Sequence, residues 1–155
     1  MKQMHLPDRS RDADWAMEQF SKSEYAFVAV NGDDGIPYNV PLCLVCVGNA
    51  LYFHTALHGH AGDLFRRDGR VCATCAPKAW RDPAHTTMRF RSAMAFGDVV
   101  EVTDPSEKVN AMGHFFAKYL PNDPRAEALA HRAATHAAVW KITVREAIGK
   151  ENAPE

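Results

Sequence analysis

The sequence has 155 residues, the length of one domain, and 46% of them are hydrophobic. A chain of this kind buries enough apolar surface to form a core, so a disordered protein is excluded. The formal net charge of -1 at pH 7 lacks the basic excess of a general nucleic-acid binder. We therefore predict a single domain over residues 1–155, with no nucleic-acid partner.

Hydrophobic periodicity and turn residues divide this chain into helices and strands. In chain order they predict a helix from a cap at Ser10 or Asp12 to about Phe20, strands at 25–30, 37–47 and 50–54, a short helix at 63–67, strands at 70–75 and 90–102, helices at 104–120 and 125–137, and a strand at 138–147. Residues 76–88 contain two prolines and little periodicity, which predicts a long surface loop.

Individual residues add detail to these strands. Pro41 has no amide proton, so the strand at 37–47 should lie at a sheet edge or carry a bulge there. Gly48 and Asn49 form a two-residue hairpin signal, and Gly97 marks a bulge or bend inside a long strand. Asp104, followed by proline and then by glutamate at the third helical position, is a strong helix start.

The order of the elements predicts a fold class. Strands linked by hairpins that close on themselves indicate a small antiparallel barrel, because closure removes unpaired edges. Helices do not alternate with strands, so a doubly wound α/β fold is excluded. We therefore predict a mainly β protein with α elements: a six-stranded antiparallel split β-barrel with flanking helices.

The start of the chain and its apolar runs bear on location. The first residues carry no apolar segment of a secretory signal, and the longest apolar runs, near 40–47, are too short to span a bilayer. We expect a cytoplasmic protein with no membrane partner. In that reducing compartment disulfides are not expected.

Two Cys-x-x-Cys pairs, Cys43/Cys46 and Cys72/Cys75, have the spacing of a zinc site. Each pair lies in a β-rich run, however, where residues three apart point to opposite faces of the sheet. Neither pair has the turn residues that would bring both sulfur atoms to one side. We therefore expect free thiols and no metal site, with zinc kept as an alternative.

A histidine-rich stretch follows the third predicted strand. It contains His54, His58 and His60, and a helix begins just after it. The imidazoles could ligate a metal or move protons, and the amides of a helix N-terminus can bind phosphate. Arg91 and Ser92 also carry donors suited to phosphate oxygens. The alternatives are a solvated polar loop and an exposed strand with ordinary cations.

Four motifs together resemble the pyridoxamine-phosphate-oxidase-like flavoproteins, and more narrowly their nitroimidazole-resistance branch. They are Gly35-Ile-Pro37-Tyr38-Asn-Val40-Pro41-Leu42, then Phe53-His54-x-Ala56-x-x-Gly59-His60 with Asp63-Leu64 and Arg70-Val71-Cys72, then Arg91-Ser92-x-x-x-x-Gly97, and finally Ile148-Gly149-Lys150. The resemblance extends from about Tyr25 to Lys150 and depends on the order and spacing of the motifs.

The resemblance implies a homodimer with FMN or FAD in a groove between the subunits. It places two groups beside the isoalloxazine: Asn39, Val40, Pro41 and Leu42, and on its other edge His54, Thr55 and Ala56. It places Gly59, His60, Ala61, Arg91 and Ser92 at or near the phosphate. The family usually has lysine where this chain has Ala61, and we expect Arg91, Arg66 or a protonated His60 to compensate.

The resemblance also implies a function. We expect a flavin-dependent oxidoreductase that passes electrons from NAD(P)H to a small acceptor, for which a nitroaromatic is one candidate. His54 is the candidate catalytic residue, as a proton donor or a group that anchors the substrate. Two alternatives remain: a flavin-binding or carrier protein without turnover, and a haem-binding split barrel with His54, His58 or His60 as axial ligand.

Overall fold

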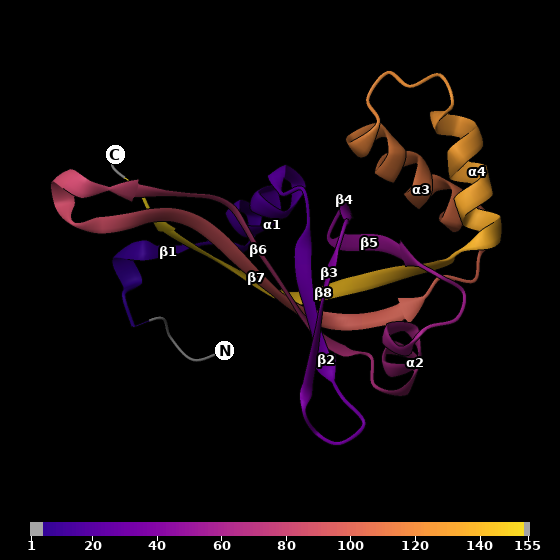
Figure 1. Ribbon diagram of the computed structural model, residues 1–155, viewed down its shortest axis with the longest axis horizontal. Helices are drawn as coiled ribbons and strands as arrows, with labels where there is room; N and C mark the ends of the chain where they lie inside the picture. The colour runs from indigo at the N-terminus through magenta and orange to yellow at the C-terminus, as the bar shows by residue number, and fades with distance from the viewer. Residues whose placement is uncertain (1–4, 154–155) are drawn as a thin grey trace.

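The computed structural model describes residues 5–153 (Figure 1). Its elements in chain order are η1 (Pro7–Arg9), β1 (Ser10–Arg11), α1 (Ala13–Lys22), β2 (Ala26–Asn31), β3 (Pro37–Leu42), β4 (Val45–Val47), β5 (Ala50–Thr55), α2 (His60–Arg67), β6 (Arg70–Asp82), η2 (Pro83–His85), β7 (Thr87–Glu101), α3 (Pro105–Tyr119), α4 (Ala126–His136) and β8 (Ala138–Asn152).

The strands pair antiparallel in one curled sheet, which confirms the predicted class. Within residues 5–153 the sheet has eight strands, in the order β3-β2-β6-β7-β8-β5-β4, with β1 paired to β8. The count exceeds the predicted six for two reasons. The strand predicted at 37–47 breaks at Cys43 and Leu44 into β3 and β4, and the two-residue β1 had no sequence signal.

The loop predicted at 76–88 is wrong, because β6 and β7 continue through it as a hairpin arm. The arm pairs residues from Lys78 with Arg91 to Asp82 with Thr87, and η2 closes its tip. In Figure 1 it projects away from the helices α2, α3 and α4. Pro77 falls at the register shift between Cys75 and Lys78, where a missing amide proton costs no ladder bond.

Local sequence signals explain other features of the sheet. β3 ends the strand order, so Pro41 lies on an edge strand as predicted. The register between β7 and β8 shifts at Gly97, where a Cβ atom would collide with the carbonyl oxygen of Thr143. The Asp104 carboxylate caps α3 by accepting from the amide of Glu107 at 2.8 Å.

The apolar side chains form two clusters. One fills the barrel and includes Phe20, Phe53, Phe65 and Trp140. The other lies between the sheet and the α3–α4 hairpin, which covers β4 and β5 in Figure 1. None of the helices within residues 5–153 has both the length and the apolarity needed to cross a membrane.

Candidate functional site

The start of α2 presents main-chain amides with no side chain over them. The helix begins at His60, earlier than predicted, and its N-cap Gly59 forms no side-chain capping bond. The first amides of a helix have no partner within the helix and carry its positive partial charge. A Cβ atom on Gly59 would meet nothing within 4 Å, so a ligand could approach this backbone closely.

Residues from β3, β5 and α2 meet around this helix start. The ring of Tyr38 packs edge-on against His60, with 5.1 Å between the ring centroids. Ala61 packs against the barrel core, and the Arg66 guanidinium lies 5.2 Å from the Trp140 ring centroid. The structure thus brings the predicted β3 segment close to the predicted phosphate end.

His54 and Thr55 are neighbours in β5, but their side chains point to opposite faces of the strand. Thr55 Oγ1 accepts from the Trp140 indole at 2.9 Å and donates to the carbonyl of Ala56 at 3.0 Å. His54 instead packs beneath α3 against Phe115, with ring centroids 4.8 Å apart. Its Nδ1 atom is buried without a hydrogen-bond partner, and burial lowers its pKa.

The predicted segment of β3 also alternates. Val40 and Leu42 pack against the barrel core, whereas Asn39 and Pro41 face outward. Only the second pair offers side chains to a ligand on the outer face, although the backbone of all four residues borders the sheet edge.

Arg91 and Ser92 lie toward the opposite end of the long strands from Thr55. Ser92 pairs with Lys150 of β8 and Thr55 pairs with Ala138, twelve residues away along the same strand. At ~3.3 Å per residue the two positions are at most about 40 Å apart, measured along the curled strand. Ser92 is closer to the β3 segment, because Met94 of the same strand lies in one cross-strand row with Pro41.

The two arginines expected to replace the missing lysine are both paired with carboxylates. Arg91 donates to Glu151 at 2.7 Å, and Arg11 binds the same carboxylate at 3.0 Å. Arg66 binds Glu101 at 2.8 Å and Asp63 at 3.2 Å. The α2 amides and the exposed His60 suit a phosphate, but neither arginine stands free to compensate for Ala61.

An apolar row crosses the outer face of the sheet, and the sequence reasoning missed it. Its members are paired across five strands: Pro41, Phe27, Thr74, Met94 and Ile148. Phe27 is 42% exposed and Met94 38% exposed. The strict alternation of β2 could have shown that Phe27 points outward, but not that three of the four residues in line with it, Pro41, Met94 and Ile148, are also apolar.

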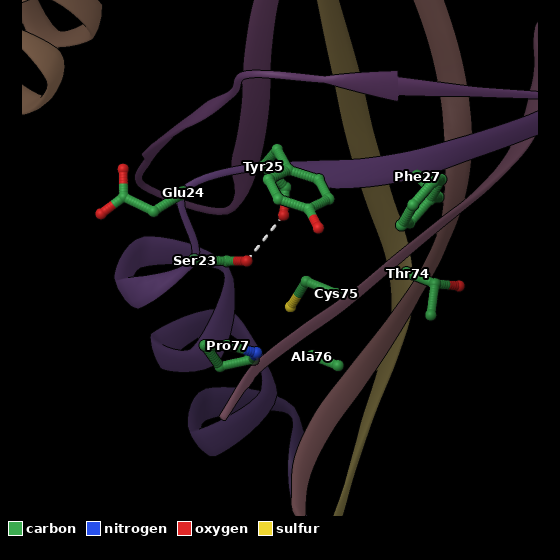
Figure 2. A pocket seen from close by; sticks show the side chains of 8 residues that line it. All are labelled: Ser23, Glu24, Tyr25, Phe27, Thr74, Cys75, Ala76 and Pro77. Atoms are coloured by element: carbon green, nitrogen blue, oxygen red, sulfur yellow. Dashed lines mark hydrogen bonds between the residues drawn. The ribbon is translucent and has the colours of Figure 1, made fainter. Parts of the chain in front are cut away.

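A hollow of about 320 Å³ borders this outer face beside Phe27. Figure 2 shows the rings of Tyr25, which immediately precedes β2, and of Phe27 in β2, with Cys75 and Pro77 of β6 below them. The two rings pack edge to face with centroids 5.6 Å apart. The hollow therefore has aromatic walls that are partly exposed to solvent.

The four cysteines are free thiols. Cys75 is buried and Cys72 is half-buried, as expected for positions on opposite faces of a strand. Burial raises the pKa of Cys75 to about 12. The part of the chain that the structure describes contains no group of three or more His, Cys, Asp or Glu side chains able to hold a metal.

Small antiparallel barrels include proteins that hold one small ligand, and this barrel has an uncapped, glycine-initiated helix at its end. The chain belongs to the pyridoxamine 5'-phosphate oxidase family, whose model matches residues 12–151. This confirms the family expected from the motifs. A search of curated proteins found no significant match.

Solved structures share the fold. A candidate 5-nitroimidazole antibiotic resistance protein from Bacteroides thetaiotaomicron is 24% identical, with a TM-score of 0.76 over 90% of this chain and 84% of that one. A flavocytochrome from Azotobacter vinelandii is 17% identical, with a TM-score of 0.78 over 97% and 72%. An FAD-binding protein from Mesorhizobium loti is 16% identical, with a TM-score of 0.69 over 94% and 98%.

Proposed function

We propose that this protein binds FMN or FAD and acts as a flavin-dependent oxidoreductase with NAD(P)H as electron donor. The observation that carries the proposal is the uncapped start of α2 beside β3, in a chain of this family. The FAD-binding protein from M. loti and the flavocytochrome from A. vinelandii, which share the fold, support the same class of cofactor.

In this proposal the chain's own residues bind and orient the nucleotide. The amides at the start of α2 and the His60 side chain hold the phosphate, while Asn39 and Pro41 border the ring system. The flavin supplies the redox chemistry once it is bound. Thr55 fixes the end of β5 through Trp140, which keeps the approach to α2 in one geometry.

We further propose that the site is completed by a second copy of the chain. Ser92 lies on the same outer face of β7 as Met94, and its partner in β8 is twelve residues from the partner of Thr55. A two-fold dimer through the apolar row would bring the Ser92 region of one copy toward α2 of the other. Exposed Phe27 and Met94 would be buried in the same step.

The role of His54 as a catalytic acid has weaker support than its place in the motif implies. Its lowered pKa keeps the imidazole neutral near pH 7, so it is a poor source of a proton there. Its position beneath α3 favours a packing role at the end of β5. A small aromatic acceptor, such as a nitroaromatic, remains the proposed substrate class.

The visible absorption spectrum of the purified protein tests the cofactor directly, because flavin, haem and zinc are readily distinguished. Titration with FMN and with FAD should show saturable binding of at least one of them. Oxidation of NADH or NADPH that depends on an added acceptor would support the enzyme. Tight flavin binding without turnover across a broad acceptor panel would favour a carrier.

Haem is the second candidate cofactor, because an FAD- and haem-binding protein from Mycobacterium smegmatis shares the fold at 15% identity and a TM-score of 0.77. In this chain His58 and His60 are exposed, and a histidine imidazole is a common axial ligand of haem iron. A haem spectrum in the protein, lost in His58→Ala or His60→Ala, would favour this reading over the flavin.

A further inference from the structure

The two ends of the sheet meet at a two-residue link. β3 and β4 follow each other in the chain and are joined by Cys43 and Leu44, yet they occupy opposite ends of the strand order. The chain therefore leaves one sheet edge and joins the other at this point, which we call the seam. Main-chain groups at such a step lose their ladder partners and need others.

Two consecutive side chains at the end of α3 supply those partners. Tyr119 Oη accepts from the Leu44 amide at 3.0 Å and lies 2.7 Å from the carbonyl oxygen of Glu24 and 2.9 Å from that of Leu44. Burial raises the pKa of Tyr119 to about 12, so the hydroxyl keeps its proton and donates to one of these carbonyls.

Lys118 completes the arrangement. Its Nζ atom donates to the carbonyls of Ser23 at 2.7 Å, Leu44 at 2.9 Å and Phe20 at 3.4 Å. An ammonium group has three donors, and a charged donor makes stronger hydrogen bonds than a neutral one. Lys118 and Tyr119, the clasp, thus tie the seam to the end of α1 and to the start of β2.

The seam adjoins the segment of β3 that would contact the flavin. Pro41 and Leu42 immediately precede it, and Pro41 pairs with Phe27. Ser23 and Glu24, whose carbonyl groups the clasp also binds, are among the residues that line the hollow beside Phe27 (Figure 2). A shift at the seam would therefore move the ring-contacting strand end and the hollow together.

We propose that Lys118 and Tyr119 are positioning residues for the flavin site, holding the end of β3 in the geometry that binds the isoalloxazine. The inference depends on the flavin-binding function proposed above. Neither residue reaches the predicted contact residues itself. Both act through the main chain of Leu44, which is bonded to Lys118 Nζ and Tyr119 Oη.

The test compares Lys118→Met and Tyr119→Phe with a matched control pair at the other end of the same helix. Lys141 and Tyr52 both bond to Glu107 in the first turn of α3, at 2.9 Å and 2.7 Å. Lys141→Met and Tyr52→Phe therefore also remove a lysine and a tyrosine anchor of α3, but their polar atoms bond to Glu107 and not to the main chain of the seam. FMN dissociation constants and thermal midpoints are measured for all four variants.

The clasp variants should bind FMN about tenfold more weakly, and Lys118→Arg should restore part of the affinity. At saturating FMN their visible circular dichroism and midpoint potential should differ from wild type, which a loss of stability alone would not cause. The control variants should lower the thermal midpoint and leave the affinity, the spectrum and the potential unchanged.

Each outcome decides a different question. If the wild-type protein binds neither FMN nor FAD, the proposed function fails. If the wild type binds flavin and Tyr119→Phe matches it in affinity, spectrum and potential, the positioning role is wrong. Tyr119→Phe removes a single oxygen atom, so it decides the matter even if Lys118→Met does not fold. Equal effects in the clasp and control variants would also overturn the proposal.

Discussion

Trp140 is 1% exposed and stands at the centre of the barrel core, so the partner of its indole N–H matters for stability. Thr55 Oγ1 accepts that proton at 2.9 Å. Thr55→Val keeps the shape and removes the acceptor, which should cost about 1–3 kcal/mol because a buried donor is left unpaired. Urea unfolding followed by Trp fluorescence measures the loss. Thr55→Ser retains the hydroxyl and should remain close to wild type.

His54 gives the protein a pH dependence whose sign follows from its burial. Because burial lowers its pKa below the ordinary value of 6.5, the unfolded chain binds the proton more readily than the folded one. The His54 side chain therefore makes the free energy of unfolding decrease as the pH falls below the ordinary pKa of 6.5. Between about pH 7.5 and about pH 5, the urea midpoint should fall less in His54→Phe than in the wild type. Equal falls in the two proteins would contradict this prediction.

The sequence located the elements better than it located the site. Pro41 and Gly97 were informative because each restricts the backbone at its own position, at an edge strand and at a bulge. From the motif, His54 and His60 were both expected to lie beside the same flavin. Alternation in β5 sends His54 to the α3 side, whereas His60 packs against Tyr38. Which face of a strand meets which helix depends on tertiary packing.

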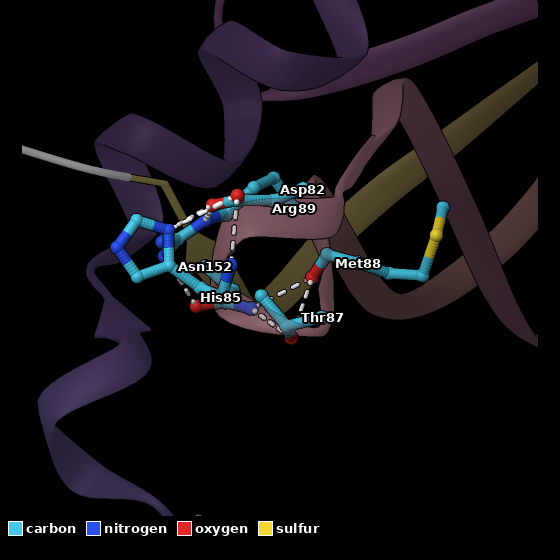
Figure 3. Close-up of polar contacts among 6 residues, drawn as sticks. All are labelled: Asp82, His85, Thr87, Met88, Arg89 and Asn152. Atoms are coloured by element: carbon cyan, nitrogen blue, oxygen red, sulfur yellow. Dashed lines mark hydrogen bonds and ion pairs between the residues drawn. The ribbon is translucent and has the colours of Figure 1, made fainter.

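At the scale of elements, the hairpin arm shows what local patterns miss. Residues 76–88 carry no apolar alternation because much of the arm is exposed on both faces. Its order comes from pairing between β6 and β7 and from contacts with the end of β8. Figure 3 shows the Asn152 side chain donating to the Met88 carbonyl, at 2.7 Å. Such contacts join segments distant in sequence, so no short window could reveal them.

Asp82 should make the order of the arm tip sensitive to acid. Hydrogen bonds from the side chains of Arg89, at 2.7 Å, and of His85 lower the pKa of Asp82 to about 2. A carboxylate whose pKa is lowered in the folded protein stabilises the fold at pH values above its ordinary pKa. This stabilisation is lost as the pH falls toward the lowered pKa. The protection of the arm-tip amides against exchange, relative to an unstructured chain, should therefore fall between about pH 4 and about pH 2. Asp82→Asn should show low protection throughout, with no step in this window.

Replacing glycine by alanine should have opposite effects on the stability of the protein at two positions, Gly97 and Gly113. A Cβ atom at Gly97 would collide with the Thr143 carbonyl across the β7–β8 bulge, whereas at Gly113 in α3 it would meet nothing within 4 Å. Gly97→Ala should destabilise the protein by about 1–3 kcal/mol or more, because the strands have to separate. Gly113→Ala should stabilise it by about 0.4–1 kcal/mol by restricting the unfolded chain. Denaturant unfolding of both variants checks the pair.

At the scale of the whole molecule, the predicted site residues lie at different places on the sheet. The β8 partners of Thr55 and Ser92 are twelve residues apart, and in the proposed dimer the Ser92 segment of one copy meets α2 of the other. The apolar row gives a surface through which two copies could associate. Phe27→Glu places a charge in that row and should shift the protein toward a monomer in light scattering. Flavin affinity should fall with it, since each site would lose its second half.

Subunit mixing tests the shared site more directly. His60→Glu puts a carboxylate at the first position of α2, which the helix tolerates but a phosphate does not. Ser92→Asp does the same in β7, at the base of the arm. Each variant alone should bind FMN weakly. In a dimer containing one of each, one site combines an unaltered α2 with an unaltered Ser92 segment, and the other combines both changes. Random pairing makes half of the dimers mixed, so co-refolding equal amounts should restore about one quarter of the sites. Recovery of none would place the whole site within one chain.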